Sequence, residues 1–474
     1  MKPHLHFMGI GGISMSGLAR WYLADGHRVS GCDNVLGPNV ERLRNEGISV
    51  LIGHSAEHLS DVDILVSTMA VPNPDIKNSV EEIEAGERPT LKSIKRIELL
   101  ADLFGKRRAI GVSGTHGKST TSGILATIFV KAGRDPSVQL GATLPLLEGV
   151  MRYGSGGDLI AEVDESDPGF AHLKSFIAVL TNLEEDHIAG DFDERRNYHA
   201  SLEDLEAAAL SYARGAEHVV YCADWDRLST LVGDLPSAVS YGFAEDATYR
   251  ITNAVLNADS STFTLQSPKE SVHVELNVPG RYNVQNAAAA LTAANLAGIS
   301  LADAVAALSS FRGVGRRWQS WGTVAGTLVI DDYAHHATEV RATLTAAKHT
   351  GRRVRAVLQP HRWIRTARHW PDLAEAAALA DEILVLDIYS AGEAPIEGIS
   401  SKLIVDRLKE MGKAASHHSF DSAQAYLQGS LQNNDLIITL GAGDVWKIAA
   451  NLVSEHQLSE HKGSANVGGE RAHS

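Results

Sequence analysis

A glycine-rich segment at residues 114–121, with the sequence GTHGKSTT, combines residue types that bind phosphate groups. Small residues let backbone N–H groups converge on phosphate oxygens at a helix N-terminus, Lys118 can reach the outer phosphates, and the Ser119 hydroxyl can ligate Mg²⁺. An ordinary glycine-rich turn is the alternative, since Val112 stands where the Walker A spacing has its first glycine. That alternative leaves the adjoining Lys, Ser and Thr unexplained. We therefore expect a nucleotide-phosphate site made by Gly114, Thr115, His116, Gly117, Lys118, Ser119 and Thr120.

A second glycine-rich turn, GIGGISMSG at residues 9–17, follows the first predicted strand. The next predicted strand ends at Asp33, at about the spacing where Rossmann-type folds hold a ribose hydroxyl. This pattern does not fix the ligand, because any diphosphate can lie at such a helix N-terminus. The alternative for Asp33 is a plain carboxylate that ends a strand or lies in a turn. The candidate binding residues of this turn are Gly9, Gly11, Gly12, Ser14 and Ser16.

Acidic residues follow two further predicted strands, 159–163 and 176–180. The first cluster is EVDESD at residues 162–167, and Glu162 lies within the strand pattern, where open α/β sheets place ligands. A solvated acidic turn is the alternative for Asp164, Glu165 and Asp167. The second cluster is TNLEEDH at residues 181–187. His187 is either structural or close to Mg²⁺, although Mg²⁺ prefers oxygen ligands.

A third polar group is expected in the last part of the chain. The segment DDYAHH at residues 331–336 is followed one predicted strand later by QPHRWIRT at residues 359–366. Histidines and arginines close to strand ends are typical of a pocket for carboxylate and phosphate groups.

Length and composition are those of a multi-domain soluble enzyme. The chain has 474 residues, of which 44% are hydrophobic, enough for about three domains. Its net charge of −15 and the lack of a Lys/Arg-rich stripe argue against nucleic acid. No run is long enough to cross a membrane, and no signal peptide is expected. Two cysteines, Cys32 and Cys222, are too few for a disulfide framework or a zinc site, so we expect a cytoplasmic protein.

Alternating strand and helix patterns run through the whole chain. A charged segment near residue 105 and the run GVGRR before Trp318 are the expected boundaries between domains. A β-rich stretch is expected from Tyr249 to Val278, and the polar end of the chain is expected to be disordered. The predicted units are residues 1–105, 106–318 and 319–455, with a tail at 456–474.

In their order along the chain, these motifs resemble the Mur ligases, and among them the alanine-adding branch. The resemblance covers nearly the whole chain and rests on GIGGISMSGLA, SGTHGKSTT, EVDESD, TNLEEDH, GRYNVQNAAAA, FRGVGRR, DDYAHH, QPHRWIRT and YSAGE. It implies an N-terminal Rossmann-like domain for a UDP-sugar, a central P-loop ATPase domain with a mostly parallel sheet, and a C-terminal Rossmann-like domain for an amino acid.

The resemblance also implies a reaction. An ATP-dependent carboxylate–amine ligase would join L-alanine to the lactyl carboxylate of UDP-N-acetylmuramate through an acyl phosphate, in the synthesis of peptidoglycan precursors and hence in cell shape and division. It implies ATP and two Mg²⁺ ions as cofactors, the two substrates as partners, and a monomer or weak homodimer. Replacing Lys118 by alanine is then expected to abolish turnover without unfolding the protein.

Residue roles follow from the same resemblance. The implied metal ligands are Ser119, Glu162 and His187. Asn286 would contact the adenine, Asp332 the ATP ribose, and Asp33 the uridine side of the UDP-sugar. The turn residues Gly9, Gly11, Gly12, Ser14 and Ser16 would hold the UDP diphosphate, and Tyr333, His335, His361 and Arg365 would surround the amino-acid end. The implied catalytic residues are Lys118, His187, Arg317, His335, His361 and Arg365, of which Arg317 also approaches the phosphates.

Two departures and two alternatives accompany the resemblance. Ser119 replaces the usual threonine, and Ala334 and Ala337 stand where the family commonly has Gly and Pro. No lysine lies between Lys174 and Lys269, which disfavours the branches that carry a carbamylated lysine.

One alternative is the sister ligase that recycles a tripeptide. The other is a nicotinamide-binding sensor or dehydrogenase, which would not need EVDESD, TNLEEDH and DDYAHH.

Overall fold

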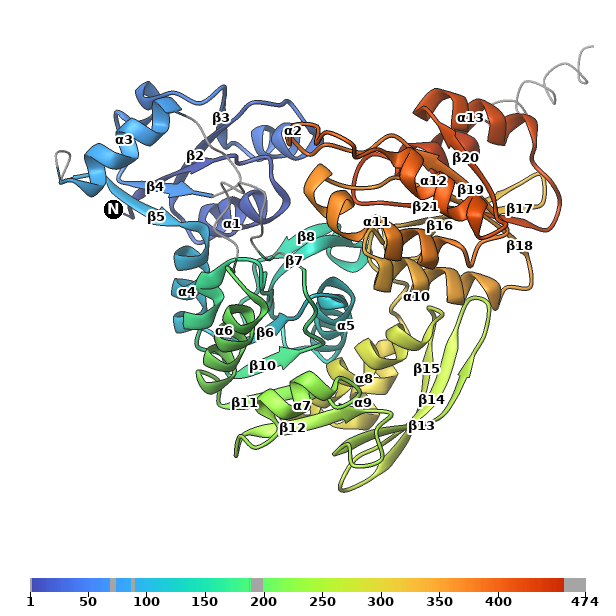
Figure 1. Ribbon diagram of the computed structural model, residues 1–474. Helices are drawn as coiled ribbons and strands as arrows, with labels where there is room; N and C mark the ends of the chain where they lie inside the picture. Colours follow the sequence, from blue (N-terminus) through green and yellow to red (C-terminus); the bar gives the residue numbers. More distant parts are fainter. Residues whose placement is uncertain (1, 69–73, 87–89, 187, 189–198, 456–474) are drawn as a thin grey trace, which may run out of the picture. The chain divides into compact units, whose positions relative to one another are not determined.

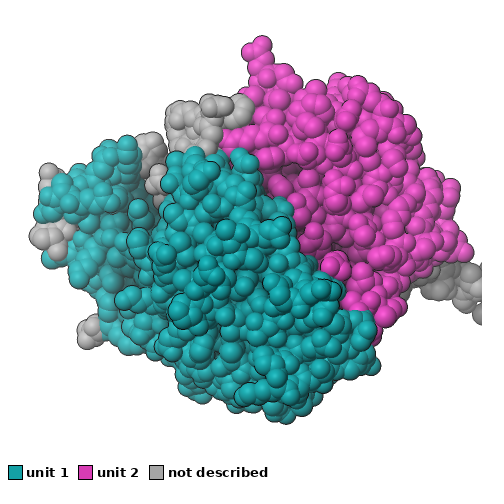
Figure 2. Space-filling view, turned by 60° about the horizontal axis from the view of Figure 1, so that its bottom comes forward, with its two compact units in different colours: residues 1–253, 263–275, 285–311 teal, residues 254–262, 276–284, 312–474 magenta. Residues whose placement is uncertain are grey.

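A computed structural model describes most of the chain as two compact units (Figures 1 and 2). One unit contains residues up to 253 together with 263–275 and 285–311, and the other contains 254–262, 276–284 and the residues from 312 onward. No helix among the described residues is long and apolar enough to span a membrane. The predicted disordered tail lies outside the described residues, which are 2–68, 74–86, 90–186, 188 and 199–455.

The first sheet is parallel and has the strand order β3-β2-β1-β4-β5. From β1 the chain adds β2 and β3 toward one edge of the sheet, and it then adds β4 and β5 on the other side of β1. Open α/β sheets bind ligands at such a switch point, outside the carboxyl ends of the strands. The turn at residues 9–12 leaves β1 at this place. The strands are β1 (His4–Met8), β2 (Arg28–Asp33), β3 (Ser49–Ile52), β4 (Ile64–Ser67) and β5 (Lys92–Lys95), with helices α1 (Ile13–Ala24), α2 (Pro38–Asn45), α3 (Pro74–Glu84), α4 (Arg96–Lys106) and the 3-10 helix η1 (Ala56–Leu59).

The second sheet has ten strands in the order β15-β14-β13-β12-β11-β10-β6-β9-β7-β8. Its middle is parallel, and β8 runs antiparallel to β7. The β-rich stretch predicted from Tyr249 to Val278 is confirmed as β13–β15. The strands are β6 (Arg108–Ser113), β7 (Ser137–Leu144), β8 (Gly149–Arg152), β9 (Asp158–Glu162), β10 (Ile177–Leu180), β11 (His218–Cys222), β12 (Ala238–Gly242), β13 (Tyr249–Leu256), β14 (Ser261–Gln266) and β15 (Ser271–Leu276).

Two helices of this part are apolar because they are buried. Helix α5 packs against β6, β7 and β9, and Ile124, Leu125 and Phe129 on it are fully buried. In α8, the alanines at 287–290 are also fully buried. The helices are α5 (Lys118–Lys131), α6 (Leu202–Arg214), α7 (Asp226–Val232), α8 (Arg281–Leu296) and α9 (Leu301–Leu308), with 3-10 helices η2 (Pro145–Leu147) and η3 (Pro168–His172).

Helix α1 connects the first two sheets within one compact unit, because it packs against β7 and β8. A Cβ atom at Gly17 would lie 2.5 Å from the Gln139 side-chain oxygen, so the Gln139 amide would have to move to admit a larger residue.

The third sheet has the order β16-β17-β21-β18-β19-β20, with antiparallel pairing only between β16 and β17. The alternation of strands and helices predicted for this part of the chain is confirmed. The elements are β16 (Gln319–Val324), β17 (Thr327–Asp332), β18 (Arg353–Leu358), β19 (Glu382–Leu386), β20 (Ala414–His418) and β21 (Asp435–Leu440), with helices α10 (Ala337–Lys348), α11 (Trp363–Ala377), α12 (Ser401–Glu410) and α13 (Phe420–Gly429).

The α/β class with mostly parallel sheets is therefore confirmed. The three sheets occupy separate stretches of the chain, and the boundaries near residues 105 and 318 fall between them. Because the compact units join the first two sheets, those boundaries remain a proposal.

Candidate active site

The predicted phosphate loop connects β6 to α5, as its sequence indicates. Gly114 has φ +126° and Gly117, which caps α5, has φ +83°, a backbone region that other residues rarely adopt. A Cβ atom at Gly117 would lie 2.5 Å from the Asn286 Oδ1 atom. The Thr121 hydroxyl donates to the same oxygen over 3.3 Å, so Asn286 of α8 lies against the loop.

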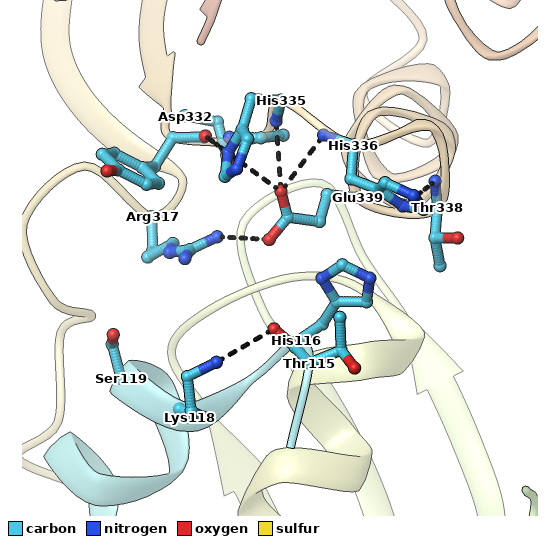
Figure 3. Close-up of polar contacts among 12 residues, drawn as sticks. Thr115, His116, Lys118, Ser119, Arg317, Asp332, His335, His336, Thr338 and Glu339 are labelled. Carbon is cyan, nitrogen blue, oxygen red and sulfur yellow. Dashed lines mark hydrogen bonds and ion pairs between the residues drawn. The ribbon is translucent and has the colours of Figure 1, made fainter. Parts of the chain in front are cut away.

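Lys118 is held within the loop. Its ammonium donates to the carbonyl oxygens of Gly114 at 2.6 Å and Thr115 at 3.1 Å, the second of which Figure 3 shows. It also forms a 2.6 Å ion pair with Glu165, whose side chain is 1% exposed. Burial alone would lower the pKa of Lys118, but the negative charges of Glu165, Asp164 and Glu162 outweigh burial and raise it. Lys118 is therefore a fixed positive charge at the start of α5.

We predict that Gly114→Ala destabilises the protein by more than about 2 kcal/mol, because it combines backbone strain with overpacking. The added Cβ would lie 2.3 Å from Thr181 Oγ1 and 2.8 Å from Asn182 O. Gly133→Ala is the matched control. Gly133 has φ +73° but nothing within 4 Å of an added Cβ, so only the strain of about 1 kcal/mol is expected. If the two variants lose the same free energy of unfolding in denaturant, overpacking at residue 114 is contradicted.

Glu162 ends β9 beside the loop. One carboxylate oxygen accepts the Ser119 hydroxyl at 3.1 Å, and the other accepts the Gly141 N–H at 2.8 Å. A Cβ atom at Gly141 would lie 2.7 Å from either oxygen. A hydroxyl and a carboxylate are oxygen donors of the kind that Mg²⁺ prefers, so Ser119 and Glu162 fit that ion. His187, the third predicted ligand, lies outside the described residues.

The remaining acids of the EVDESD segment mostly serve the local turn. Asp164 accepts from the Ser166 amide at 3.1 Å and hydroxyl at 2.7 Å. Asp167 caps η3 through the Gly169 N–H at 3.0 Å and lies 3.5 Å from Arg96. The acidic-turn interpretation therefore suits these two residues, whereas Glu165 pairs with Lys118.

The strand end after β10 supports the phosphate loop from the side. Asn182 accepts the His116 N–H at 2.7 Å, and the Thr181 hydroxyl donates to the His116 carbonyl at 2.5 Å. The His116 ring lies 2.9 Å from a Glu184 carboxylate oxygen. The sequence interpretation assigned no role to Thr181, Asn182 or Glu184. They lie beside the loop because β10 and β6 are adjacent parallel strands that end together.

Asp33 binds the glycine-rich turn of the first sheet. Its Oδ2 atom accepts the Gly11 N–H at 2.8 Å, and its Oδ1 atom accepts the Val35 N–H at 3.1 Å. The Ser16 hydroxyl donates to the Ile13 carbonyl at 3.0 Å and the residue is buried. Asp33 thus has the turn-stabilising role that was left open. Gly9 has φ +72°, Gly12 caps α1, and Ser14 lies in its first turn.

The loop after β17 is organised by Glu339 of α10. Glu339 forms a 3.1 Å ion pair with Arg317 and accepts the His335 N–H at 3.1 Å (Figure 3). Helix α10 begins at Ala337, the position where the family commonly has proline, and His336 and Glu339 supply a capping box there. Ala334 is buried and donates its N–H to Asp332. The two alanine departures are thus accommodated locally.

Aromatic rings and an arginine gather beside this loop. The His335 ring contacts those of Tyr333 and His361, with centroids 5.3 Å and 5.5 Å away. His361 also stacks on Tyr389 at 5.7 Å, and its Nδ1 atom lies 3.3 Å from an Arg365 guanidinium nitrogen. The structure therefore brings together the four residues predicted for the amino-acid end.

Sequence interpretation overlooked two supporting residues in this part. Arg316 forms an ion pair with Asp331 at 3.1 Å and donates to the carbonyls of Gly441 and Gly443 at 2.6 and 3.0 Å. Glu393, within the YSAGE motif, forms an ion pair with Arg362 and accepts the Ile364 N–H at 3.1 Å. Both join loops that are distant in sequence.

Asp332 gives a pH-dependent prediction. It accepts the N–H groups of Trp318 and Ala334 at 2.8 and 2.9 Å, and burial, only partly offset by Arg317, raises its pKa to about 6. Between about pH 4 and 6 the folded carboxyl keeps its proton while the unfolded one has lost it, so stability falls as pH rises through this window. Asp332→Asn should therefore gain up to about 3 kcal/mol relative to the wild type between pH 4 and 7.

The measurement is the free energy of unfolding of both proteins at each pH. Asp381→Asn is the control, because the pKa of Asp381 is lowered by Lys348, against a burial effect that would raise it. That variant should lose stability relative to the wild type as pH rises. A difference for Asp332→Asn that does not change with pH would contradict the assigned shift.

Comparisons with known proteins agree along the whole chain. Family models described as "Mur ligase family, catalytic domain", "Mur ligase middle domain" and "Mur ligase, glutamate ligase domain" match residues 4–108, 112–294 and 316–443. A UDP-N-acetylmuramate–L-alanine ligase of Deinococcus radiodurans is 42% identical over 95% of this chain and 93% of its own length. One from Solidesulfovibrio magneticus is 36% identical over 97% and 98%.

Among solved structures, a UDP-N-acetylmuramate–alanine ligase of Thermotoga maritima superposes with a TM-score of 0.81 at 29% identity, covering 96% of this chain and 100% of that one. A murein peptide ligase of Psychrobacter arcticus gives a TM-score of 0.67 at 24% identity, covering 96% of this chain and 98% of that one, which shows a shared fold. The motifs, the three sheets and these matches together show that the chain belongs to the Mur ligase family.

Proposed function

We propose that this protein is an ATP-dependent ligase that joins L-alanine to the lactyl carboxylate of UDP-N-acetylmuramate in peptidoglycan precursor synthesis. The observation that carries the chemistry is the placement of Lys118, Ser119 and Glu162 at the carboxyl ends of the adjacent strands β6 and β9. The choice of substrates is supported by the names of relatives that are similar over nearly the full chain.

The reaction needs an activated carboxylate, because a free carboxylate is a poor acylating agent at neutral pH. A lactyl carboxylate oxygen attacks the γ-phosphorus of ATP, the bond to the β,γ-bridging oxygen breaks, and ADP leaves. The alanine amine then attacks the carbonyl carbon of the acyl phosphate. The tetrahedral intermediate expels phosphate and the nitrogen loses a proton, which leaves the amide.

Lys118 would compensate the negative charge that gathers on the transferred phosphoryl group, from a position already fixed by two backbone carbonyls. Ser119 and Glu162 would hold Mg²⁺, whose chemistry is to neutralise the phosphate oxygens. The family pattern adds His187 near a second ion. Because Glu162 is itself oriented by the Gly141 N–H, the carboxylate needs little rearrangement to accept a cation.

The remaining assignments follow the family pattern. Asn286 would contact adenine, Asp332 the ATP ribose and Arg317 the phosphates. The residues at 9–16 and Asp33 would hold the UDP moiety, with Asp33 acting through the Gly11 amide that it orients. His335 and His361 would act at the acyl-phosphate end, and Arg365 would pair with the alanine carboxylate. We further propose a cytoplasmic enzyme that acts as a monomer or weak homodimer and binds neither nucleic acid nor membrane.

The test is phosphate release from Mg-ATP with UDP-N-acetylmuramate and one further reactant at a time. L-Alanine, L-serine, glycine and the recycled tripeptide are the reactants to compare. We expect release that depends on both the UDP-sugar and L-alanine. Release with the tripeptide but not with L-alanine would assign the chain to the recycling branch. No release in any mixture, from a folded protein, would contradict a ligase function.

A further inference from the structure

A second group of potential metal ligands lies in the first sheet, away from the phosphate loop. His6 is on β1, Cys32 is at the end of β2, and His58 is on η1. One ligand atom from each of the three lies within 4.8 Å of the other two. His6 is 1% exposed and Cys32 is fully buried. These residues come from three separate elements, so the grouping is a product of the fold.

The hydrogen bonds around His6 leave one of its nitrogens as a lone-pair donor. The Asp61 carbonyl can only accept, so the His4 Nδ1–H donates to it at 2.9 Å, and in the tautomer with its proton on Nδ1 the His4 Nε2 atom accepts from the Ser30 hydroxyl at 2.8 Å. The Ser30 oxygen in turn accepts the His6 Nδ1–H at 2.9 Å. The His6 Nε2 atom is left with a lone pair, and among the described residues it has no hydrogen-bond partner.

Two further observations suit a metal site. The buried His58 Nδ1 atom also has no hydrogen-bond partner in the described part of the chain. The His6 and His58 rings also lie beside each other, with their centroids 6.1 Å apart. A buried polar nitrogen without a partner is costly, and two of them occur here in histidines that each have a ligand atom within 4.8 Å of the Cys32 sulfur.

We propose that His6, Cys32 and His58 bind a divalent transition-metal ion of the zinc type. Imidazole nitrogen and thiolate sulfur are the donors that Zn²⁺ takes in proteins. On binding, the sulfur electron pair goes to the ion and the thiol proton leaves to solvent. His54, whose Nδ1 atom lies 3.0 Å from the Cys32 sulfur, positions the thiol, and Ser30 positions His6 in the way that carboxylates and carbonyls orient other metal-bound histidines.

The ion would stiffen the glycine-rich turn. The Cys32 carbonyl accepts the N–H groups of Gly9 at 2.8 Å and Ile10 at 3.2 Å, and the next residue, Asp33, holds the Gly11 N–H. A metal ion that holds Cys32 to β1 and η1 would therefore also fix the end of β2, whose backbone and Asp33 side chain accept the hydrogen bonds of the turn. Bound metal is expected to raise the unfolding temperature of this part of the protein by mass action.

The experiment uses untagged, chelator-treated full-length protein titrated with Co²⁺ and without any substrate. We expect a thiolate-to-cobalt charge-transfer band that saturates at one ion per chain and disappears on adding Zn²⁺. Cys32→Ser should abolish the band, His58→Gln should weaken Co²⁺ binding by about 100-fold, and Ser30→Ala by about 10- to 100-fold. Cys222→Ser, which alters the other buried cysteine, is the matched control and should keep the charge-transfer band.

Absence of the band in the wild type, or its persistence in Cys32→Ser, would overturn the proposal. Circular dichroism shows whether each variant is folded. If Cys32→Ser does not fold, X-ray absorption of the zinc-loaded wild type decides between one sulfur with imidazole nitrogens, as proposed, and a shell without sulfur. None of these readouts depends on ligase activity, so the result is independent of the proposed function.

Discussion

Replacing Lys118 by alanine is expected to lower the rate of phosphate release by about 10³-fold or more, because a positioned cation at a transferring phosphoryl group contributes about 10³ to 10⁵ in rate. The sequence alone predicts that this variant folds normally, and the structure changes that expectation. Glu165 is almost fully buried 2.6 Å from the Lys118 ammonium. Removing one partner of such a pair leaves an uncompensated charge, so we also expect a loss of about 3 kcal/mol in unfolding free energy.

The double variant Lys118→Met with Glu165→Gln separates the two effects. It removes both charges and should recover most of the stability, while turnover stays lost. Both quantities are measured on the same preparations, by denaturant unfolding and by phosphate release. Turnover near the wild-type rate in the folded double variant would reject the role of Lys118 at the phosphates.

Glu162→Gln is expected to lower turnover by about 10²- to 10³-fold and to raise the Mg²⁺ concentration needed for half-maximal rate. The amide can still accept one of the two hydrogen bonds that hold Glu162, from Ser119 or Gly141, so the fold should survive. The physical reason for the effect is the loss of a formal negative charge from the oxygen donors proposed for the ion. The measurement is the Mg²⁺ dependence of initial rate at saturating ATP.

Asp158→Asn is the matched control because Asp158 begins the same strand that Glu162 ends. Its carboxylate pairs with Arg134 at 3.0 Å and Arg108 at 3.6 Å, at the opposite end of the sheet from the loop. It should lose stability without changing the Mg²⁺ dependence. An unchanged Mg²⁺ dependence in Glu162→Gln would remove this residue from the proposed metal site.

Local patterns in the sequence predicted the parts of the site that lie within one turn. The strand, glycine loop and helix around Lys118 follow from an apolar run, two glycines at positive φ and an apolar helix, all adjacent in sequence. The same holds for the turn at residues 9–12, where the hydrogen bond from Gly11 to Asp33 has the spacing that Rossmann-type folds show.

Contacts between distant segments were not predictable in this way. Glu162 is oriented by Gly141 because β7 lies beside β9 in the sheet, and His116 is oriented by Asn182 because β10 lies beside β6. Residue types alone did not separate Glu165, which pairs with Lys118, from Asp164 and Asp167, which serve a turn. That distinction depends on which carboxylate the fold buries.

The cysteine count illustrates the same limit. Two cysteines in 474 residues argue against a zinc site when ligands are sought by spacing along the chain. The structure supplies the missing ligands as histidines from β1 and η1, and the Ser30 hydroxyl that fixes one of them lies opposite His6 in the strand register. The group of His6, Cys32 and His58 is recognised from strand register and burial, which cannot be read from composition.

The most direct test of the proposed reaction uses UDP-N-acetylmuramate labelled with ¹⁸O in its lactyl carboxylate, together with Mg-ATP and L-alanine. Mass spectrometry of both products follows the label. An acyl phosphate intermediate predicts the L-alanyl amide of the UDP-sugar and a single ¹⁸O atom in the released phosphate. Phosphate without label, or the absence of the alanyl product from a folded enzyme, would contradict the account.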